Sequence, residues 1–218
     1  MKRVIFVIIG LAFILAAKVY AYDDGDFQIW NTDTEEYKIN KDLKVSLEEE
    51  FRWGGNASEF YYQHYDLGLS YVINKYWSIG GGYRQIYELS KRKLRMENAP
   101  YLTATLLLSG GGFSFESRNR LEYRYFEYKA GSGRYRNKFT LKYPLRFAKL
   151  EIQPFVSDEV FFGFGSINQF NQNRVSAGLG VNLTKNIKAE VYYMLITAKS
   201  SGKWIDSNVL GTKLKIAF

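Results

Sequence analysis

Charged side chains gather on one face of two alternating stretches of this sequence, and they are the residues best suited to bind ions. The first stretch consists of Glu116, Arg118, Arg120, Glu122 and Arg124, and the second of Arg136, Lys138 and Lys142. Arginine and lysine bind carboxylates and phosphates through charge-assisted hydrogen bonds. The spacing therefore predicts a basic surface that either attracts anionic solutes or is neutralised by acids beside it.

A second candidate chemistry involves His64, the only histidine in the chain. His64, Asp66 and Ser70 fall on one face of a predicted strand and resemble a nucleophile with its base. A strand rises roughly 3.3 Å per residue, so His64 and Ser70 lie about 20 Å apart. They cannot hydrogen bond directly, and we predict a histidine that is hydrogen bonded in the interior rather than a catalytic one. The chain is accordingly not predicted to be an enzyme.

No metal or cofactor site is predicted. The acidic pair Asp158-Glu159 points to opposite faces of a strand and has no ligand spacing with a partner. The glycine cluster at residues 80–82 precedes no helix-forming run, so it is not a phosphate loop. We expect the strand glycines to permit curvature or the close approach of an interior side chain. The chain contains no cysteine, which excludes a disulfide framework.

The elements that position these residues are strands, because hydrophobic and polar residues alternate through most of the chain and no helical period appears. We predict ten strands, with their approximate ranges at residues 43–53, 61–71, 77–89, 100–108, 113–128, 135–143, 150–162, 174–184, 187–197 and 207–218. An eleventh candidate, residues 27–39, is less regular and carries Asp33, Glu35 and Glu36. Because bacterial barrels usually have an even strand number, residues 22–42 are expected along the rim, in the lumen, or as an irregular extra strand. Twelve strands are the alternative count.

The alternation predicts an all-β fold, a transmembrane antiparallel up-and-down β-barrel. Aromatic residues make up 17% of the chain, yet the mean hydropathy is −0.28, as when lipid-facing and lumen-facing residues alternate. Each arginine on the lipid face costs roughly 2–4 kcal/mol near the midplane, so Arg118, Arg120 and Arg124 belong inside. The predicted lumen-lining residues are Arg84, Glu116, Arg118, Arg120, Glu122, Arg124, Arg136, Lys138, Lys142, Glu159, Arg174 and Lys213.

The two ends of the chain predict its compartment. Lys2 and Arg3 precede an apolar stretch from Val4 to Ala17, and a cleavage site is expected at Val19-Tyr20-Ala21; this is typical of a secretory signal peptide over residues 1–21, with the barrel domain over 22–218. The last strand ends on an aromatic residue, and Leu214, Ile216 and Phe218 share its apolar face. This pattern resembles the C-terminal signal by which the barrel assembly machinery inserts bacterial outer-membrane proteins. The predicted location is therefore the bacterial outer membrane.

The remaining bulk features limit the partners. The formal net charge is +8, and three basic residues of segment 1–21 account for part of it. The excess is too small to predict nucleic-acid binding. Five short connections are expected on the periplasmic side and five longer loops outside, among them Ser90 to Glu97. The basic residues of that loop, Lys91, Arg92, Lys93 and Arg95, are candidates for contact with lipopolysaccharide phosphates.

Three stretches resemble the domain-of-unknown-function 2490 family, uncharacterised bacterial exported proteins regarded as outer-membrane barrels. They are Glu97-Asn98-Ala99-Pro100-Tyr101, residues 118–124 (RNRLEYR) and residues 153–162 (QPFVSDEVFF), with Asp26 to Trp30 as a fourth. Position 99 departs from the pattern, which would have arginine there. The resemblance implies a fold and a location but no activity. The size and basic interior are also similar to those of small oligogalacturonate-type porins.

Two functions follow as expectations. The favoured one is a small porin-like channel for small solutes, including anions. The alternative is a non-conducting structural or surface-interaction barrel, because a barrel of ten to twelve strands is close to the size at which side chains fill the interior. A lipid-modifying barrel enzyme is the third. Outer-membrane lipid, lipopolysaccharide and the assembly machinery are the expected partners.

Overall fold

The computed structural model describes residues 24–143, 152–165, 168–200 and 202–218, and the predicted signal peptide lies outside them. Within these ranges the regular structure consists of strands alone: β1 (Asp26–Lys38), β2 (Leu43–Gly54), β3 (Glu59–Val72), β4 (Trp77–Ser90), β5 (Lys93–Gly110), β6 (Phe113–Phe126), β7 (Ser132–Lys142), β8 (Ile152–Phe164), β9 (Gln169–Asn182), β10 (Ile187–Ser200) and β11 (Lys203–Ala217). The described part of the chain contains no helix of the length and apolarity needed to traverse a bilayer.

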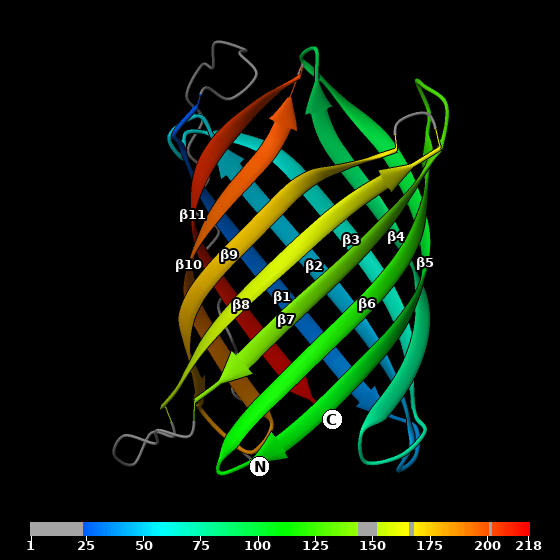
Figure 1. The fold of residues 1–218 in the computed structure, drawn as a ribbon, viewed down its shortest axis with the longest axis vertical. Coiled ribbons are helices and arrows are strands. Elements are labelled where there is room, and N and C mark those ends of the chain that lie inside the picture. Colours follow the sequence, from blue (N-terminus) through cyan, green and yellow to red (C-terminus); the bar gives the residue numbers. More distant parts are fainter. Residues whose placement is uncertain (1–23, 144–151, 166–167, 201) are drawn as a thin grey trace, which may run out of the picture.

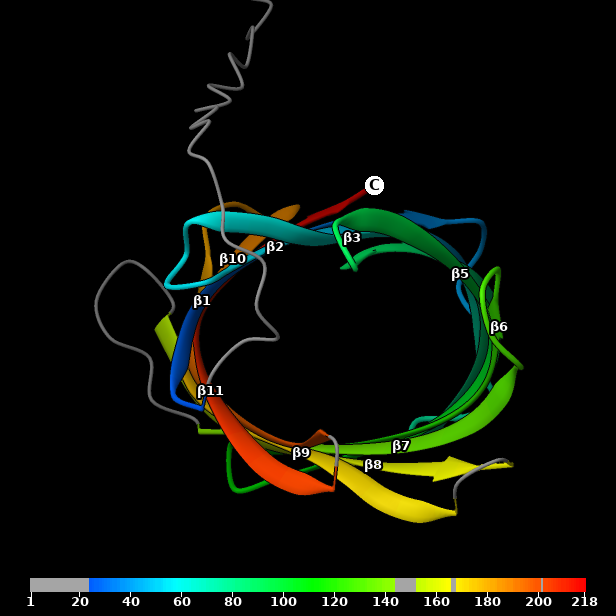
Figure 2. The same cartoon turned by 90° about the horizontal axis from the view of Figure 1, so that it is seen from above.

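The strands close into one barrel (Figure 1). Each strand pairs with its neighbours in sequence in antiparallel fashion, and β1 pairs with β11 to complete the ring. Viewed along its axis the ring is oval and surrounds the lumen (Figure 2). A closed sheet leaves no unpaired edge, which is what a strand-built structure requires in lipid, where water cannot satisfy backbone groups. The prediction of an all-β barrel is confirmed.

The described residues form eleven strands, close to the predicted ten, and residues 26–38 account for the difference. Of the three places considered for residues 22–42, the extra strand is the one observed. Its pairing departs from the predicted antiparallel pattern, because β1 runs parallel to β11, with Asp26 opposite Ser207 and Glu36 opposite Ala217. Both strands therefore run toward the end of the barrel that holds Phe218, here named the C-terminal end.

The seam between β1 and β11 is held by backbone and side-chain hydrogen bonds. The Phe218 amide donates to the Glu36 carbonyl at 2.8 Å, and the Thr212 hydroxyl donates to the Asn31 side-chain oxygen at 2.7 Å. At the other end, the Gly25 amide donates to the Asp206 carbonyl at 2.9 Å. The contacts extend along the whole length of the strand, so β1 is an integral wall of the barrel.

The pairing of β1 with β11 can be tested by an engineered disulfide across the seam. The natural chain has no cysteine, and residues 31 and 212 are register partners whose side chains touch on the outer face. The double substitution Asn31→Cys and Thr212→Cys should cross-link on oxidation, since adjacent strands place Cα atoms about 5 Å apart, within disulfide range. The product is seen as a faster-migrating unfolded band on a non-reducing gel.

The control is Ile29→Cys with Thr212→Cys, because Ile29 pairs with Leu210 and is shifted from residue 212. This variant should cross-link poorly. Absence of the oxidised band in the first variant would contradict the parallel seam and favour a barrel that begins at β2.

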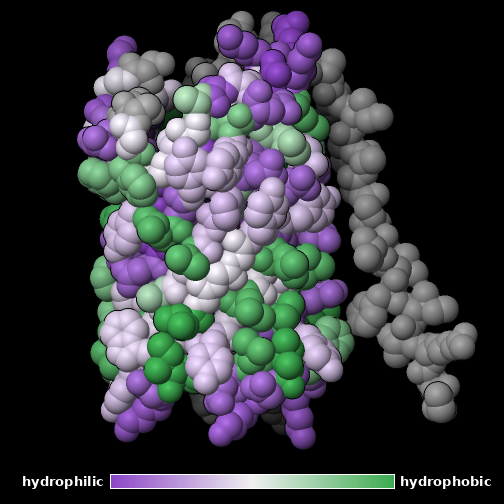
Figure 3. Space-filling model, turned by 90° about the vertical axis from the view of Figure 1, so that its right-hand side faces the viewer, coloured by the Kyte–Doolittle hydropathy of each residue, from purple (hydrophilic) through white to green (hydrophobic). Residues whose placement is uncertain are grey.

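The two faces of the sheet differ as the alternation requires. Large apolar and aromatic side chains such as Leu67, Leu102 and Tyr123 are exposed on the outer face. One side of the barrel shows hydrophobic and pale residues around the middle and hydrophilic ones at both ends (Figure 3). The exceptions include the outer face of β1, which carries Asp33 and the exposed Glu35.

The expectation of short connections at one end of the barrel and longer loops at the other is wrong. The strands flanking the predicted loop Ser90 to Glu97 extend into it, and only Lys91 and Arg92 form the turn between β4 and β5. Both have positive φ angles, 50° and 63°, as a two-residue hairpin turn needs. At the end opposite Phe218, the strand bounds leave two to five residues per connection. Contact of this basic turn with lipopolysaccharide stays a prediction.

Candidate functional site

The lumen contains a cavity of about 980 Å³. Its lining includes Thr184, Asn186 and Ala217 at the C-terminal end, and it extends inward to Trp30, Arg52 and Arg174. Among the described residues, thirteen lysines or arginines line it against six glutamates. The cavity is therefore a strongly basic chamber, and its positive field should concentrate anions.

Ten of the twelve residues predicted to line the lumen border this cavity. They are Arg84, Glu116, Arg118, Arg120, Arg136, Lys138, Lys142, Glu159, Arg174 and Lys213. The other two, Glu122 and Arg124, point to the interior beyond the cavity: Glu122 is buried beneath Arg134 and Arg136, and Arg124 is paired with Glu97.

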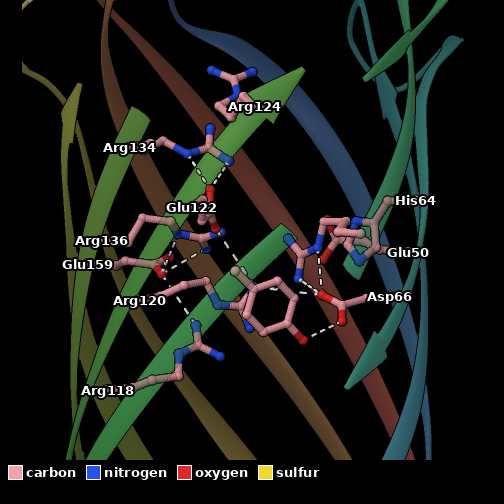
Figure 4. Close-up of polar contacts among 12 residues, drawn as sticks. Glu50, His64, Asp66, Arg118, Arg120, Glu122, Arg124, Arg134, Arg136 and Glu159 are labelled. Carbon is pink, nitrogen blue, oxygen red and sulfur yellow. Dashed lines mark hydrogen bonds and ion pairs between the residues drawn. The ribbon is translucent and has the colours of Figure 1, made fainter. Parts of the chain in front are cut away.

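Glu159 on β8 is the shared acid of the cavity's inner end. Its carboxylate lies 2.8 Å from Arg136 and 3.4 Å from Arg118 (Figure 4). Arg174 lies 3.8 Å from the same carboxylate. Lys138, its register partner on β7, adds a fourth cation at longer range. One carboxylate thus serves four cations, and positive charge is in excess here.

Glu122 on β6 is a second shared acid, nearer the opposite end. It accepts a hydrogen bond from Arg134 at 2.6 Å and another from Arg136 at 2.9 Å. Arg120 lies 3.8 Å away. Because Arg136 reaches both Glu122 and Glu159, the two acids belong to one network (Figure 4).

Asp66 on β3 extends this network to the facing wall. Arg84 donates to it at 2.8 Å and the Tyr101 hydroxyl at 2.5 Å, while Arg120 lies 3.6 Å away and stacks on the Tyr101 ring. Gly82 makes room for Tyr101, since a methyl group at position 82 would collide with its ring and hydroxyl. This agrees with the expected role of the strand glycines.

His64 is fully buried in the same wall, between two partners. Its Nε2 lies 3.2 Å from Glu48 and its Nδ1 lies 3.1 Å from the Tyr62 hydroxyl. Asp66 bonds to Arg84 and Tyr101 instead, and Ser70 lies further along β3. The suspected triad of His64, Asp66 and Ser70 is therefore not assembled, and both ring nitrogens of His64 have partners. Among the described residues, no group of three potential metal ligands occurs.

One wall of the cavity is apolar, which the sequence analysis did not anticipate. Trp30, Phe155, Tyr192 and Met194 form a buried cluster and also line the cavity. They come from β1, β8 and β10. Phe155 lies four residues before Glu159 on the same strand, so the two side chains point to the same face. The sequence could therefore have placed Phe155 inside. Trp30 could not, because β1 was not counted as a regular strand.

Beyond the cavity, the interior is filled by side chains. We name this region the closed half. It is defined by five residues that are each less than 9% exposed: Gln28, Tyr61, Glu97, Phe161 and Val209. At its boundary Arg52 is stacked between the rings of Trp30, at 3.6 Å, and Tyr62, at 3.8 Å. Phe161 is 1% exposed and lies within 6 Å of three guanidinium groups. The lumen is thus wide at the C-terminal end and packed at the other.

The proposed insertion signal lies on the outer face of β11. The side chains of Leu214 and Phe218 are exposed there, 36% and 64% respectively, and Ile216 has the same parity. The position fits recognition from outside the barrel, and the recognition itself stays a prediction.

Comparison with known proteins identifies the family and the fold. No curated protein matches the sequence. Among solved structures, the barrel is similar to a NanC porin, with a TM-score of 0.53 and 9% sequence identity, over 84% of this chain and 94% of that one. At this identity the likeness shows the fold alone, a porin-like barrel. The family model for proteins of unknown function DUF2490 matches residues 27–206, so the chain belongs to the DUF2490 family.

Proposed function

We propose that this barrel resides in the bacterial outer membrane and acts as a narrow porin-like channel for small anionic solutes. The observation that carries the proposal is the cavity of about 980 Å³ with thirteen basic and six acidic lining residues. Charged linings select ions by sign in other pores. The porin-like fold and the apolar outer face support the location.

The closed half would then be the constriction. Ion pairs and ring stacking hold the side chains of the closed half in place. A passage through it therefore opens when these side chains rearrange, without a movement of the backbone. Arg134, for example, donates to Glu122 from the inner face of β7. The inner end of the cavity and the constriction share Arg136, which links the charge of the chamber to the narrowest part.

Planar-bilayer recording of the refolded barrel tests this function. A potassium chloride gradient should give single-channel steps whose reversal potential lies closer to the equilibrium potential of chloride than to that of potassium. The double variant Lys138→Glu and Lys142→Glu changes the lining from thirteen basic and six acidic residues to eleven and eight, and it should shift the reversal potential toward that of potassium. The sign follows because an acid that faces the pathway repels anions.

The matched control is Lys41→Glu. Lys41 lies in the turn between β1 and β2, its side chain is 90% exposed, and it does not line the cavity. Its charge reversal should leave the reversal potential nearly unchanged. Equal shifts in both variants would mean that the cavity is not the conduction pathway.

The packed closed half favours a second function, a non-conducting barrel. Glu97, Phe161 and Val209 are each at most 3% exposed, so the static structure shows no wide passage at that level. Complete silence of folded protein in bilayers, over a range of voltages, would support this alternative and remove the channel.

A further inference from the structure

The inner end of the cavity combines two features that a simple ion passage does not need: cations without close counter-ions and an adjoining apolar wall. The cations are Lys138 on β7 and Lys213 on β11, which both line the cavity and whose charges act on each other. The wall is the cluster of Trp30, Phe155, Tyr192 and Met194. Together they describe a binding site for a solute with two different ends.

The two lysines at this site have no direct ion-pair partner among the described residues. Glu159 acts on Lys138, and Glu48, Glu190 and Glu50 act on Lys213, only at longer range. Glu159 is already shared by Arg118, Arg136 and Arg174.

Two buried arginines that line the same cavity have hydrogen-bond donors without acceptors. Arg120 is 7% exposed, and its Nε and Nη1 atoms have no hydrogen-bond partner; the same holds for Nε of Arg174. Buried polar groups are nearly always hydrogen bonded, so unpaired donors in a functional cavity point to a missing acceptor. An oxyanion supplies both the negative charge and the acceptor atoms.

The apolar wall lies beside these cations. The Lys213 ammonium is 5.6 Å from the Tyr192 ring centroid, and the Arg174 guanidinium is 5.0 Å from that of Trp30. Gly211 allows this arrangement, because a methyl group there would collide with Tyr192. Ligand pockets commonly combine an apolar surface with a few polar groups that fix orientation. A cavity of about 980 Å³ also holds far more than a chloride ion.

We infer that the inner end of the cavity binds small organic anions that carry an apolar ring. The oxyanion lies between Lys138 and Lys213, with the Arg120 and Arg174 donors nearby, and the ring lies against Trp30 and Tyr192. This assignment rests on the proposed function, since it names the class of solute that the channel would take.

The test uses three probes and the refolded barrel in detergent, with binding measured by equilibrium dialysis. Benzoate has both the charge and the ring, acetate has only the charge, and benzamide has only the ring. Benzoate should bind about tenfold more tightly than either of the others, as expected when one charged hydrogen bond or one buried ring is lost. Equal binding of benzoate and acetate would overturn the inference and leave only a counter-ion effect.

Substitutions locate the site. Lys213→Gln and Lys138→Gln should each weaken benzoate binding by about tenfold, because each removes a charged partner of the oxyanion. Lys142→Gln is the matched control: it lies on the same strand as Lys138, faces the same cavity and is four residues closer to the C-terminal end. It should change benzoate binding by less than about twofold, since solvent screens a more distant charge. Equal losses in Lys142→Gln and Lys138→Gln would overturn the assignment.

The binding and conductance results separate the two proposals. Benzoate binding without conductance keeps the site and removes the channel. Conductance without preferential benzoate binding keeps the channel and removes the site. Should a lysine variant fail to fold, the comparison of the three probes on the natural protein still decides the matter.

Discussion

Glu122→Gln should lower the free energy of unfolding by about 3–5 kcal/mol, the range expected when one partner of a buried ion pair is removed. The Glu122 side chain is 2% exposed and contacts Arg134, Arg136 and Arg120. Glutamine keeps the shape but removes the charge, which leaves three guanidinium groups to repel one another in a site with little water. Urea unfolding in lipid vesicles, followed by tryptophan fluorescence, measures the change as a lower midpoint with an unchanged slope.

The matched control for this prediction is Glu116→Gln. Glu116 lies on the same strand and the same inner face, but it is only half-buried and lines the open cavity. No ion pair within the described residues involves its carboxylate, so the change should stay within about 0.5 kcal/mol, as for substitutions away from special features. A loss of similar size in both variants would show that interior charge in general, rather than the Glu122 network, stabilises the barrel.

A double substitution identifies the interaction itself. Arg134 donates to Glu122 at 2.6 Å, so Glu122→Gln combined with Arg134→Gln should destabilise less than the sum of the two single changes. The shortfall is the coupling energy, expected between about 0.5 and 3 kcal/mol for residues in one network. Additive effects would mean that the pair contributes nothing of its own.

The strand pattern of this chain was predictable wherever charged and apolar side chains alternate along a strand. Three arginines on the strand from Phe113 to Phe126 determine its inner face, because each would cost several kcal/mol outside. The same reasoning fails for β1, whose outer face carries Asn31, Asp33 and Glu35. That strand is held by backbone pairing with β2 and β11, and pairing leaves no periodic mark in the side chains.

Turn chemistry explains the error in the loops. A basic, polar stretch such as residues 90–97 reads as a loop from composition, yet Lys91 and Arg92 alone make the turn. Lysine and arginine seldom adopt positive φ angles, so the sequence contains no signal for a two-residue hairpin at this point. Loop length therefore gives no basis for assigning one end of the barrel to the periplasmic side.

The sequence predicts which residues of the candidate site point inward, but it does not predict which of them contact one another. Parity along each strand identifies which charges point inward. The pairing of Arg120 with Asp66 joins β6 to β3, and it depends on the oval shape of the barrel and on side-chain length. The closed half was missed for a related reason: parity places Phe161 inside, while its contact with three guanidiniums depends on strands β7 and β9 beside it.

Phe161→Ala should open the constriction and raise the single-channel conductance. The ring is 1% exposed in the closed half, and the guanidinium groups of Arg134, Arg136 and Arg174 lie 5.8, 4.7 and 4.6 Å from its centroid. Truncation removes the ring from the closed half and leaves the three cations to line the gap. We expect at least about a twofold higher conductance with the anion preference retained, since pore radius and lining charge set these two properties. Planar-bilayer recording measures both.

Phe155→Ala is the control for this prediction, because Phe155 faces the interior of the same strand but lines the part of the lumen that is already wide. It should raise the conductance much less than Phe161→Ala does while costing stability of similar size, about 3–5 kcal/mol for a buried phenylalanine. The channel and the non-conducting barrel predict different results for this comparison of variants. If the natural protein conducts and Phe161→Ala conducts more, the closed half is the constriction of a channel. If the natural protein is silent and Phe161→Ala alone conducts, the closed half is a seal and the non-conducting barrel is correct. Equal conductance of all three proteins would place the narrowest point outside the closed half and contradict the role given to Phe161.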